Sequence, residues 1–335
     1  MERKTFIRAA AAGGASAVTA AGFPSLLRAA TMTLRFAHYV PADHPAGVAA
    51  KQFAERVAAR TQGAIAINIF PNNQLGDPPA QAAQIRQGSI DIGLPTQGQL
   101  DKYEKAFAAV VLPFVFNDRA EVFKVMDGPV IEWLAPLAAK QGFITLRNWD
   151  YGFRNVTNTV RPVNTPDDIK GLKIRTPPEI QIASTMEALG AVVTPISFAE
   201  LYLALSQKVV DGEENPIATI YYSKFYEVQK YLALTHHIYN NMILTVSAIT
   251  WNKLSREQQA IFREEGVAAG DLMRKLMGEQ ENDQIAKLGA AGMQITRPNL
   301  APFRAKMGPA VKKISDYAGA ENVDKFVAIV RKTLA

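Results

Sequence analysis

Two arginines and an asparagine lie at the ends of segments that the sequence predicts to be extended. Arg175 closes the predicted strand 172–175, Asn215 closes the run 209–215, and Arg154 begins another extended run. In open α/β sheets, ligands bind beyond the carboxyl ends of the strands. A guanidinium suits a carboxylate because its planar fork donates two parallel charge-assisted hydrogen bonds. The three side chains therefore predict an anion-binding cleft, although each taken alone also fits a surface ion pair or a turn.

No pattern in the chain predicts catalysis. The four histidines lie outside any H-E-x-x-H helix, and the adjacent Glu213 and Glu214 face opposite sides of a predicted strand. The sequence contains no G-x-S-x-G elbow, P-loop or G-x-G-x-x-G turn. It has no cysteine, which excludes disulfide bonds, thiolate metal sites and cysteine nucleophiles. We therefore expect a protein that is not an enzyme and that holds no metal or cofactor.

The composition is that of an ordinary globular protein. The 335 residues are 48% hydrophobic and 20% charged, and the length suggests two domains. Half of the net charge of +6 arises within residues 1–30, where four basic residues accompany one acidic residue. No basic stripe occurs in the remainder, so nucleic acid is not an expected partner.

The first 30 residues are typical of an export signal peptide. A basic region (1–8) precedes 14 uncharged residues (9–22) and a stretch of small residues (28–31). The string E-R-K-T-F-I-R at the start suits the twin-arginine export route, with lysine in the second place. The longest later apolar run, 106–116, is interrupted by Pro113 and is too short to span a membrane; we expect it to form a buried strand or loop. The sequence thus predicts an exported protein without stable membrane insertion.

Short β-rich runs alternate with helical runs from residue 33 onward, which predicts α/β sheets packed between helices. The expected strands are 33–37, 64–70, 90–94, 143–146, 172–175, 191–194 and 209–211. The expected helices are 46–60, 79–88, 178–190, 197–207 and 255–291.

Two of these helices begin at a capping-box pattern, Ser197 with Glu200 and Ser255 with Gln258. The proline-free run 255–291 is long enough to cross two domains, about 55 Å at 1.5 Å per residue. Its glycines mark points at which it could bend: Gly266, Gly270 and Gly278.

Seven distinctive strings occur in order along the chain. They are F-P-N-N-Q-L-G-D (70–77), L-P-F-V-F (112–116), W-D-Y-G-F-R-N (149–155), D-D-I-K-G-L-K-I-R-T-P (167–177), G-A-V-V-T-P-I-S-F-A-E-L-Y-L-A-L (190–205), V-V-D-G-E-E-N-P (209–216) and F-Y-E-V-Q-K-Y-L (225–232). Together they resemble the solute-binding subunit of tripartite ATP-independent periplasmic (TRAP) transporters, of the dicarboxylate-binding type. The resemblance covers residues 33–335, and seven strings at compatible spacing are specific where one alone is weak.

This resemblance implies a two-lobe periplasmic-binding-protein fold of the type II-like class, with a hinge and a long helix that spans both lobes. The first lobe would comprise 31–151 with about 241–281, and the second 152–240 with about 282–335. It also implies a monomer in the periplasm that captures a small organic acid. The partners would be the small and large membrane subunits of an ion-gradient-driven permease.

The resemblance further assigns ligand-binding positions. Arg175 falls on the arginine that pairs with the substrate carboxylate, and Arg154 on a second ligand contact. Asn215 falls on the asparagine that holds the arginine and the ligand in place, and Phe198 on an aromatic residue that packs over the ligand. Loops and walls that line the cleft in relatives correspond to Thr96, Gln97, His38, Tyr39, Asp77, Trp149 and Tyr222, of which the last two also fit core positions.

Three alternative functions are left open. A receptor for an ATP-driven importer shares the two-lobe architecture, and a sensor could present a bound acid to a signalling receptor. An exported enzyme ranks last because no catalytic constellation occurs. The ligand is also open, since a C4 dicarboxylate, a 2-oxo acid, a sugar acid and an aromatic carboxylate all fit one arginine clamp.

Overall fold

The structure, a computed structural model, describes residues 31–335, so the predicted export signal at 1–30 lies outside the described residues. Ten strands form one mixed sheet in this part of the chain. The strands are β1 (Met32–Ala37), β2 (Ile65–Phe70), β3 (Ile92–Gly93), β4 (Phe143–Asn158), β5 (Lys173–Thr176), β6 (Val192–Pro195), β7 (Gly212–Pro216), β8 (Tyr231–Ala233), β9 (Tyr239–Ser247) and β10 (Gln294–Thr296). The α-helices are α1 (Pro45–Arg60), α2 (Pro78–Gln87), α3 (Gln97–Leu100), α4 (Ala106–Ala109), α5 (Arg119–Val125), α6 (Ile131–Lys140), α7 (Ile180–Ala188), α8 (Phe198–Ser206), α9 (Ile217–Tyr222), α10 (Ala248–Trp251), α11 (Arg256–Ala290), α12 (Ala301–Ala305), α13 (Gly308–Ala318) and α14 (Ala320–Leu334).

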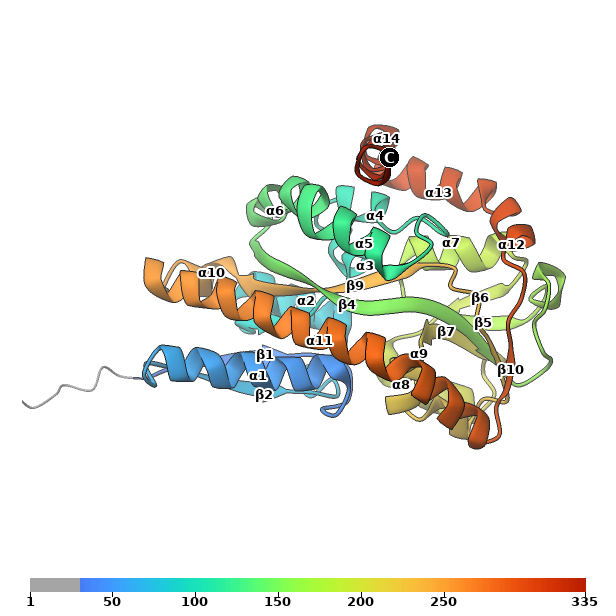
Figure 1. Ribbon diagram of the computed structural model, residues 1–335, viewed down its shortest axis with the longest axis horizontal. Helices are drawn as coiled ribbons and strands as arrows, with labels where there is room; N and C mark the ends of the chain where they lie inside the picture. Colours follow the sequence, from blue (N-terminus) through green and yellow to red (C-terminus); the bar gives the residue numbers. More distant parts are fainter. Residues whose placement is uncertain (1–30) are drawn as a thin grey trace, which may run out of the picture.

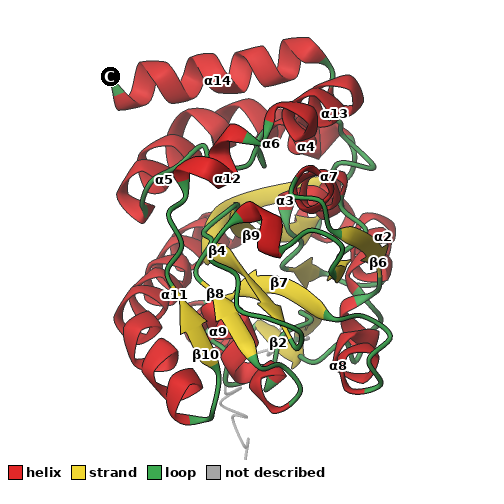
Figure 2. Ribbon diagram, turned by 90° about the vertical axis from the view of Figure 1, so that its right-hand side faces the viewer, coloured by secondary structure: helices red, strands yellow, loops and turns green. Residues whose placement is uncertain are grey.

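The sheet consists of two halves that share strand β4. The first half has the order β2-β1-β3-β9-β4, and the second has the order β4-β7-β5-β6, with β8 on β4 and β10 on β8. Figure 1 shows β4 running through both halves, and Figure 2 shows the strands in the middle of the molecule with helices around them. The predicted α/β class is confirmed.

Strand β4 changes partners along its length. Its residues up to Phe153 pair with β9, whereas those from Arg154 onward pair with β7, and the last three pair also with β8. A register shift next to Gly152, whose φ is +104°, bends the strand just before the change. The predicted strand 143–146 was therefore too short, and Arg154 lies inside a strand rather than at the start of one. This position places Arg154 between the two halves.

The predicted helix 255–291 is α11, which begins at the predicted Ser255–Gln258 capping box and continues over 35 residues without a break at its glycines. Figure 1 shows it crossing both halves. Its glycines do not break it: Gly266 and Gly270 let side chains of β9 and β4 approach closely, whereas no described residue packs against Gly278. A Cβ at Gly270 would lie 2.8 Å from Trp149, and the Trp149 indole donates to the carbonyl of Gly266 at 3.0 Å.

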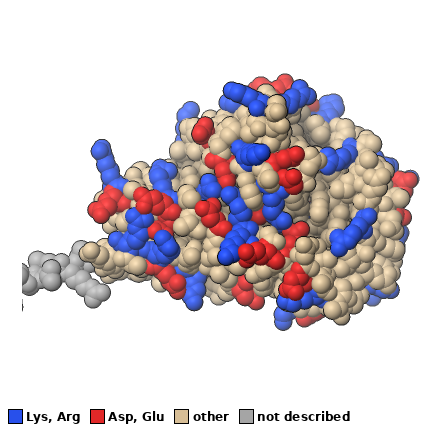
Figure 3. Space-filling model, viewed as in Figure 1, with Lys and Arg blue, Asp and Glu red and all other residues tan. Residues whose placement is uncertain are grey.

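Ion pairs connect α11 to its neighbouring elements. Figure 3 shows positive and negative side chains intermixed on this face of the molecule. Arg274 of α11 pairs with Asp127 at 2.5 Å, and Arg147 of β4 lies 3.2 Å from both Asp127 and Asp271. Arg119 joins Asp150 of β4 to Glu281 of α11. Networks of this kind are worth more than isolated surface pairs, which contribute up to about 1 kcal/mol each.

Two local predictions were wrong, and a third was wrong in part. The run 209–211 is not a strand: Lys208 has a φ of +57° in the turn after α8, Val209 is 54% exposed, and β7 begins at Gly212. Ser197 precedes α8 but forms no capping hydrogen bond, and its buried Oγ has no partner within the described residues. The run 106–116 is buried apart from half-buried Val115, and its part 110–116 is a loop as predicted, but 106–109 form the one-turn helix α4.

Of the last two helices, α13 packs against elements from both halves and α14 against elements of the first. Helix α13 contacts α7 and α4, and α14 contacts α5 and α4. The predicted lobe boundaries stay a prediction, because the sheet is continuous through β4. Within residues 31–335, no helix is long and apolar enough to cross a membrane.

Candidate functional site

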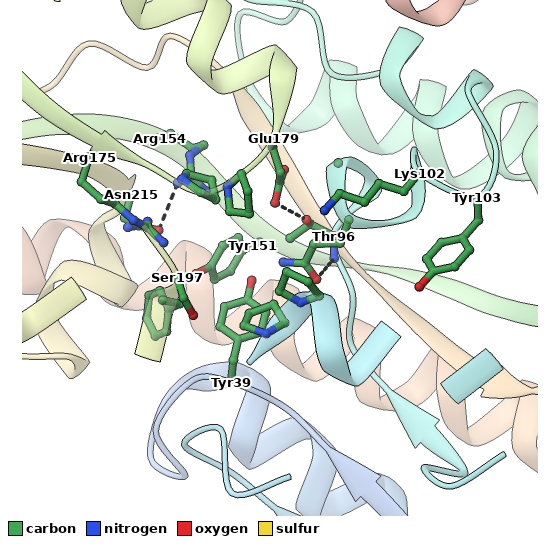
Figure 4. A pocket seen from close by; sticks show the side chains of 17 residues that line it. Tyr39, Thr96, Lys102, Tyr103, Tyr151, Arg154, Arg175, Glu179, Ser197 and Asn215 are labelled. Carbon is green, nitrogen blue, oxygen red and sulfur yellow. Dashed lines mark hydrogen bonds between the residues drawn. The ribbon is translucent and has the colours of Figure 1, made fainter. Parts of the chain in front are cut away.

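A pocket lies where the two halves of the sheet face each other. Its cavity volume is only about 40 Å³, so the surrounding side chains nearly fill it in this closed arrangement. Figure 4 shows Arg175 and Asn215 on one side of it and Thr96 and Lys102 on another. Its walls come from loops of the first half and from the ends of β5 and β7 in the second: Tyr39, Pro78, Pro79, Thr96, Gly98, Gln99, Lys102, Tyr103, Tyr151, Arg154, Arg175, Pro177, Pro178, Glu179, Ser197, Phe198 and Asn215.

Arg175 is a buried cation without a paired carboxylate. Its side chain lines the pocket, the residue is 1% exposed, and its Nε donates to the carbonyl of Ile196 at 2.8 Å. Among the described residues it forms no ion pair, and its two terminal nitrogens make no hydrogen bond. Burial lowers the pKa of Arg175 to about 10, because removal from water disfavours the charged form more than the nearby Glu214 and Glu213 favour it. The guanidinium therefore has unused donors and an uncompensated charge.

Arg154, by contrast, is neutralised by Glu214. Its Nε and Nη2 donate to the two carboxylate oxygens of Glu214 at 2.5 and 2.7 Å. Further bonds run to the carboxamide oxygens of Asn215 and Asn240, both at 3.2 Å. Burial acts to lower the pKa of Arg154, but the charge and hydrogen bonds of Glu214 outweigh it and raise that pKa. Arg154 thus lies in the pocket wall as one member of a buried ion pair.

Asn215 links Arg154 to a second buried carboxyl. Its Oδ1 accepts from Arg154, and its Nδ2 donates to Glu213 at 2.5 Å. Glu213 is the register partner of Arg175 across the parallel β5–β7 pair, so both side chains leave the same face of the sheet. Burial raises the pKa of Glu213 to about 7. Glu213 is consequently a weak counter-charge for Arg175.

Glu179 closes the pocket from the second half of the molecule. Its Oε1 accepts a hydrogen bond from the Thr96 hydroxyl at 3.0 Å, while its buried Oε2 has no partner within the described residues. Burial raises the pKa of Glu179 to about 7. A second bond across the same junction joins Gln181 to Asp101 at 2.9 Å. Both bonds connect the loops after β3 with the start of α7.

Aromatic side chains cover the remaining wall. The rings of Tyr39 and Phe198 meet edge to face with centroids 5.2 Å apart, and Tyr39 meets Tyr151 at 6.1 Å. Tyr39 comes from the first half and Phe198 from the second. Such rings supply apolar contact area above a polar floor.

The structure brings six of the predicted site residues to this pocket: Arg175, Arg154, Asn215, Phe198, Thr96 and Tyr39. The other five lie elsewhere. Trp149 and His38 are buried in the core beside Phe36, and Asp77 caps the N-terminus of α2. Gln97 accepts from the main-chain nitrogen of Asn241 and lines another small cavity. Tyr222 donates to Gln280 of α11 and lines a neighbouring cleft that shares Tyr39 and Phe198 with the pocket.

Sequence reasoning missed Glu179, Tyr151, Lys102 and Ser197. Of these, Glu179 carries a readable signal. It occupies the N-cap position of α7, where Ser, Thr, Asp and Asn are preferred, and its side chain makes no capping bond. A residue that breaks a local preference in this way marks a position with another role.

Comparisons with known proteins place the chain in a family. Residues 36–316 match the model of bacterial extracellular solute-binding protein, family 7. The sialic acid-binding periplasmic protein SiaP of Vibrio cholerae is 35% identical over 281 residues, which are 84% of this chain and 87% of that protein.

Solved structures agree with this assignment. A TRAP periplasmic solute-binding protein from Polaromonas sp. JS666 bound to D-erythronate has a TM-score of 0.85 and 33% identity, covering 89% of this chain and 98% of its own. A second, from Sulfurospirillum deleyianum with bound succinate, has a TM-score of 0.83 and 28% identity, covering 89% and 99%. The expected two-lobe fold of a TRAP solute-binding protein is thereby confirmed, and the chain belongs to family 7 of the bacterial extracellular solute-binding proteins, which are binding proteins and not enzymes.

Proposed function

We propose that the pocket captures a small organic acid in the periplasm by binding its carboxylate to Arg175. The observation that carries this proposal is the buried guanidinium, which has within residues 31–335 neither an ion pair nor hydrogen bonds on its terminal nitrogens. A buried charge is stable when it is paired and hydrogen-bonded, and a carboxylate supplies one opposite charge and two acceptor oxygens. The relatives that hold D-erythronate and succinate support the same ligand class.

The test compares acids with neutral analogues of the same shape. Purified protein would be titrated with a panel of organic acids and, for each that binds, with the matching carboxamide. We expect the acid to raise the melting temperature, since a ligand at 100 times its Kd stabilises by about 2.7 kcal/mol. The carboxamide should give no shift at the same concentration. Equal affinity for acid and amide would contradict the proposal.

We infer that the two halves hinge about β4 to admit and enclose the acid. The bonds Thr96–Glu179 and Gln181–Asp101, with the Tyr39–Phe198 contact, join the halves across the pocket and must open for a ligand to enter. We propose the predicted boundaries, 31–151 with about 241–281 and 152–240 with about 282–335, as the moving bodies. Small-angle scattering should show a smaller radius of gyration at saturating ligand. An unchanged profile would argue against hinge closure.

Delivery to a TRAP permease is the second part of the proposal. Uptake reconstituted with the small and large membrane subunits should require an ion gradient and not ATP. Uptake that needs ATP and survives collapse of the gradients would assign the protein to an ATP-driven importer instead.

We also propose that residues 1–30 direct export by the twin-arginine route. Replacing Arg3 with lysine should then leave the precursor in the cytoplasm. Export that continues at the same rate would indicate another route.

A further inference from the structure

The carboxyl group of Glu179 is built into the pocket. The residue is 4% exposed, and one oxygen is fixed by the Thr96 hydroxyl while the other is buried and unpartnered within the described residues. Figure 4 shows Glu179 on the side of the pocket nearest Thr96 and Lys102, with Arg175 and Asn215 on the far side. An acid whose carboxylate is held at Arg175 therefore extends toward Glu179.

The first half of the molecule makes room for this carboxyl group. A Cβ placed on Gly98 would lie 2.0 Å from Glu179 Oε2 and 2.6 Å from its carboxyl carbon. Gly98 has a φ outside the left-handed region, so its role is to provide space and not backbone freedom. Any other residue at position 98 would displace Glu179. The closed pocket is therefore shaped around a carboxyl at this position.

The charges around Glu179 leave it without a firm counter-ion. Arg154 is the cation that most favours the charged form of Glu179, but Glu214 already neutralises Arg154. Asp101 and Glu214 act on Glu179 with the same sign of charge. Lys102 lines the same part of the pocket but is exposed and forms no ion pair with Glu179. The buried groups at this end of the pocket are therefore mainly carboxyl groups, which accept hydrogen bonds and carry negative charge when ionised.

We propose that Glu179 selects the class of cargo: it accepts hydrogen bonds from hydroxyl groups on the far end of the bound acid and repels a second carboxylate there. The cargo is then a hydroxylated monocarboxylic acid, not a dicarboxylic acid. This inference rests on the proposed function, because it needs the acid's carboxylate at Arg175. The relatives with D-erythronate and with succinate show that the shared fold admits both classes. A local feature such as Glu179 must decide between them.

The test uses pairs of acids that differ only at the far end. D-Erythronate and meso-tartrate share four carbons and the same internal hydroxyls, and differ by a terminal CH₂OH against a carboxylate. D-Galactonate and galactarate form the equivalent six-carbon pair, and butanoate and succinate form the pair without hydroxyls. Calorimetric titration at pH 8, where Glu179 is ionised, gives the ratio of affinities within each pair.

For the wild type we expect the hydroxy monoacid to bind at least tenfold more tightly than its dicarboxylate partner. Glu179→Gln keeps the size and the acceptor for Thr96 but removes the charge. The substitution should lower the affinity for the monoacid by about tenfold and raise the affinity for the dicarboxylate. The ratio of the two affinities should then come close to one or invert. In a series from pH 8 to pH 6, the wild-type ratio of monoacid affinity to dicarboxylate affinity should fall toward one as Glu179 takes up a proton. This series tests the proposal even if the variant does not fold.

Two control variants separate selection from other roles. Thr96→Val removes the bond between the halves and leaves the charge of Glu179. It should weaken both members of a pair by a similar factor without changing their ratio. Lys51→Met removes an exposed cation of α1 that lies outside the pocket wall, and it should leave both affinities and their ratio unchanged.

The outcomes distinguish the two levels of the proposal. A wild type that prefers the dicarboxylate, through Lys102 or otherwise, would overturn the assignment of Glu179. So would a Glu179→Gln ratio within about threefold of the wild type. A protein that binds none of the acids in either class would instead refute the proposed function itself.

Discussion

Arg154 and Arg175 line the same pocket and are almost equally withdrawn from solvent, yet their surroundings are opposite in kind. Arg154 gives five bonds, to the carboxylate and main-chain oxygens of Glu214 and to the carboxamides of Asn215 and Asn240, and its charge is balanced inside the protein. Arg175 gives one bond to the rest of the described chain, to a main-chain carbonyl, and no ion pair there balances its charge. The raised pKa of Arg154 and the lowered pKa of Arg175 express the same contrast.

The difference separates a structural arginine from a binding arginine. A buried pair contributes to a fold only while both members are present, and removing one strands the other. A buried charge without a partner lowers stability until something binds it. Arg154 should therefore matter for folding, and Arg175 for affinity.

The largest expected effect on stability is that of Arg154→Ala. The substitution leaves Glu214 buried opposite a neutral side chain, which costs about 3–5 kcal/mol. Arg175→Ala removes an unpaired charge, so the free energy of unfolding without ligand should stay the same or rise. Urea denaturation of both variants measures the difference, with Arg35→Ala on the exposed face of β1 as the control. Equal destabilisation by the two pocket substitutions would contradict the division into a structural arginine, Arg154, and a binding arginine, Arg175.

A smaller effect, and one that depends on pH, is expected from Glu213. Its pKa in the folded protein is about 7, above the ordinary value, so the folded state holds more protons than the unfolded state between about pH 4.5 and 7. Its contribution to stability is full below that range and is lost as the pH rises through it. Glu213→Gln should thus gain about 3 kcal/mol relative to wild type on going from pH 5 to pH 8.

The buried histidines do not obscure this comparison. Burial lowers the pKa of His38 to about 4 and that of His44 to about 3, so they destabilise the fold as the pH falls below about 6.5. The wild type and Glu213→Gln share this contribution of the histidines, so it cancels in the difference between their free energies of unfolding. A difference in stability that does not change with pH would show that Glu213 is ionised throughout.

The smallest effect is expected from Arg175→Lys. Lysine keeps the charge but not the planar fork, so one of two hydrogen bonds to the carboxylate is lost. We expect affinity about tenfold below wild type, equivalent to about 1.4 kcal/mol, and above that of Arg175→Ala. Calorimetry on the three proteins would rank them. Affinity equal to wild type would mean that a point charge is sufficient.

The sequence predicts much of this fold because its signals are local. The order of strands and helices, and the capping box and full length of α11, follow from periodicity and from residues a few positions apart. Arg175 could be singled out for the same reason, since it lies at the end of a short predicted strand, just before two prolines.

Long-range partners account for what the sequence did not show. Most of β4 looked unlike a strand because it carries polar residues whose partners are distant in the chain: Asn148 binds Met126, Asp150 binds Arg119 and Tyr239, and Arg154 binds Glu214. Trp149 looked equally like a pocket wall or a core residue, and only the fold places it against α11. The sequence likewise did not indicate that Glu214, 60 residues away, is the ion-pair partner of Arg154.

The central claim, that Arg175 is the carboxylate-binding residue, is tested most directly by calorimetric titration of Arg175→Ala beside the wild type. The titrant is an organic acid that binds the wild type, and urea denaturation without ligand accompanies it. We predict a loss of about 30-fold to several-thousand-fold in affinity, or roughly 2–5 kcal/mol, with the free energy of unfolding not reduced. Affinity within about threefold of wild type, together with a lowered free energy of unfolding, would contradict the claim and make Arg175 a structural residue.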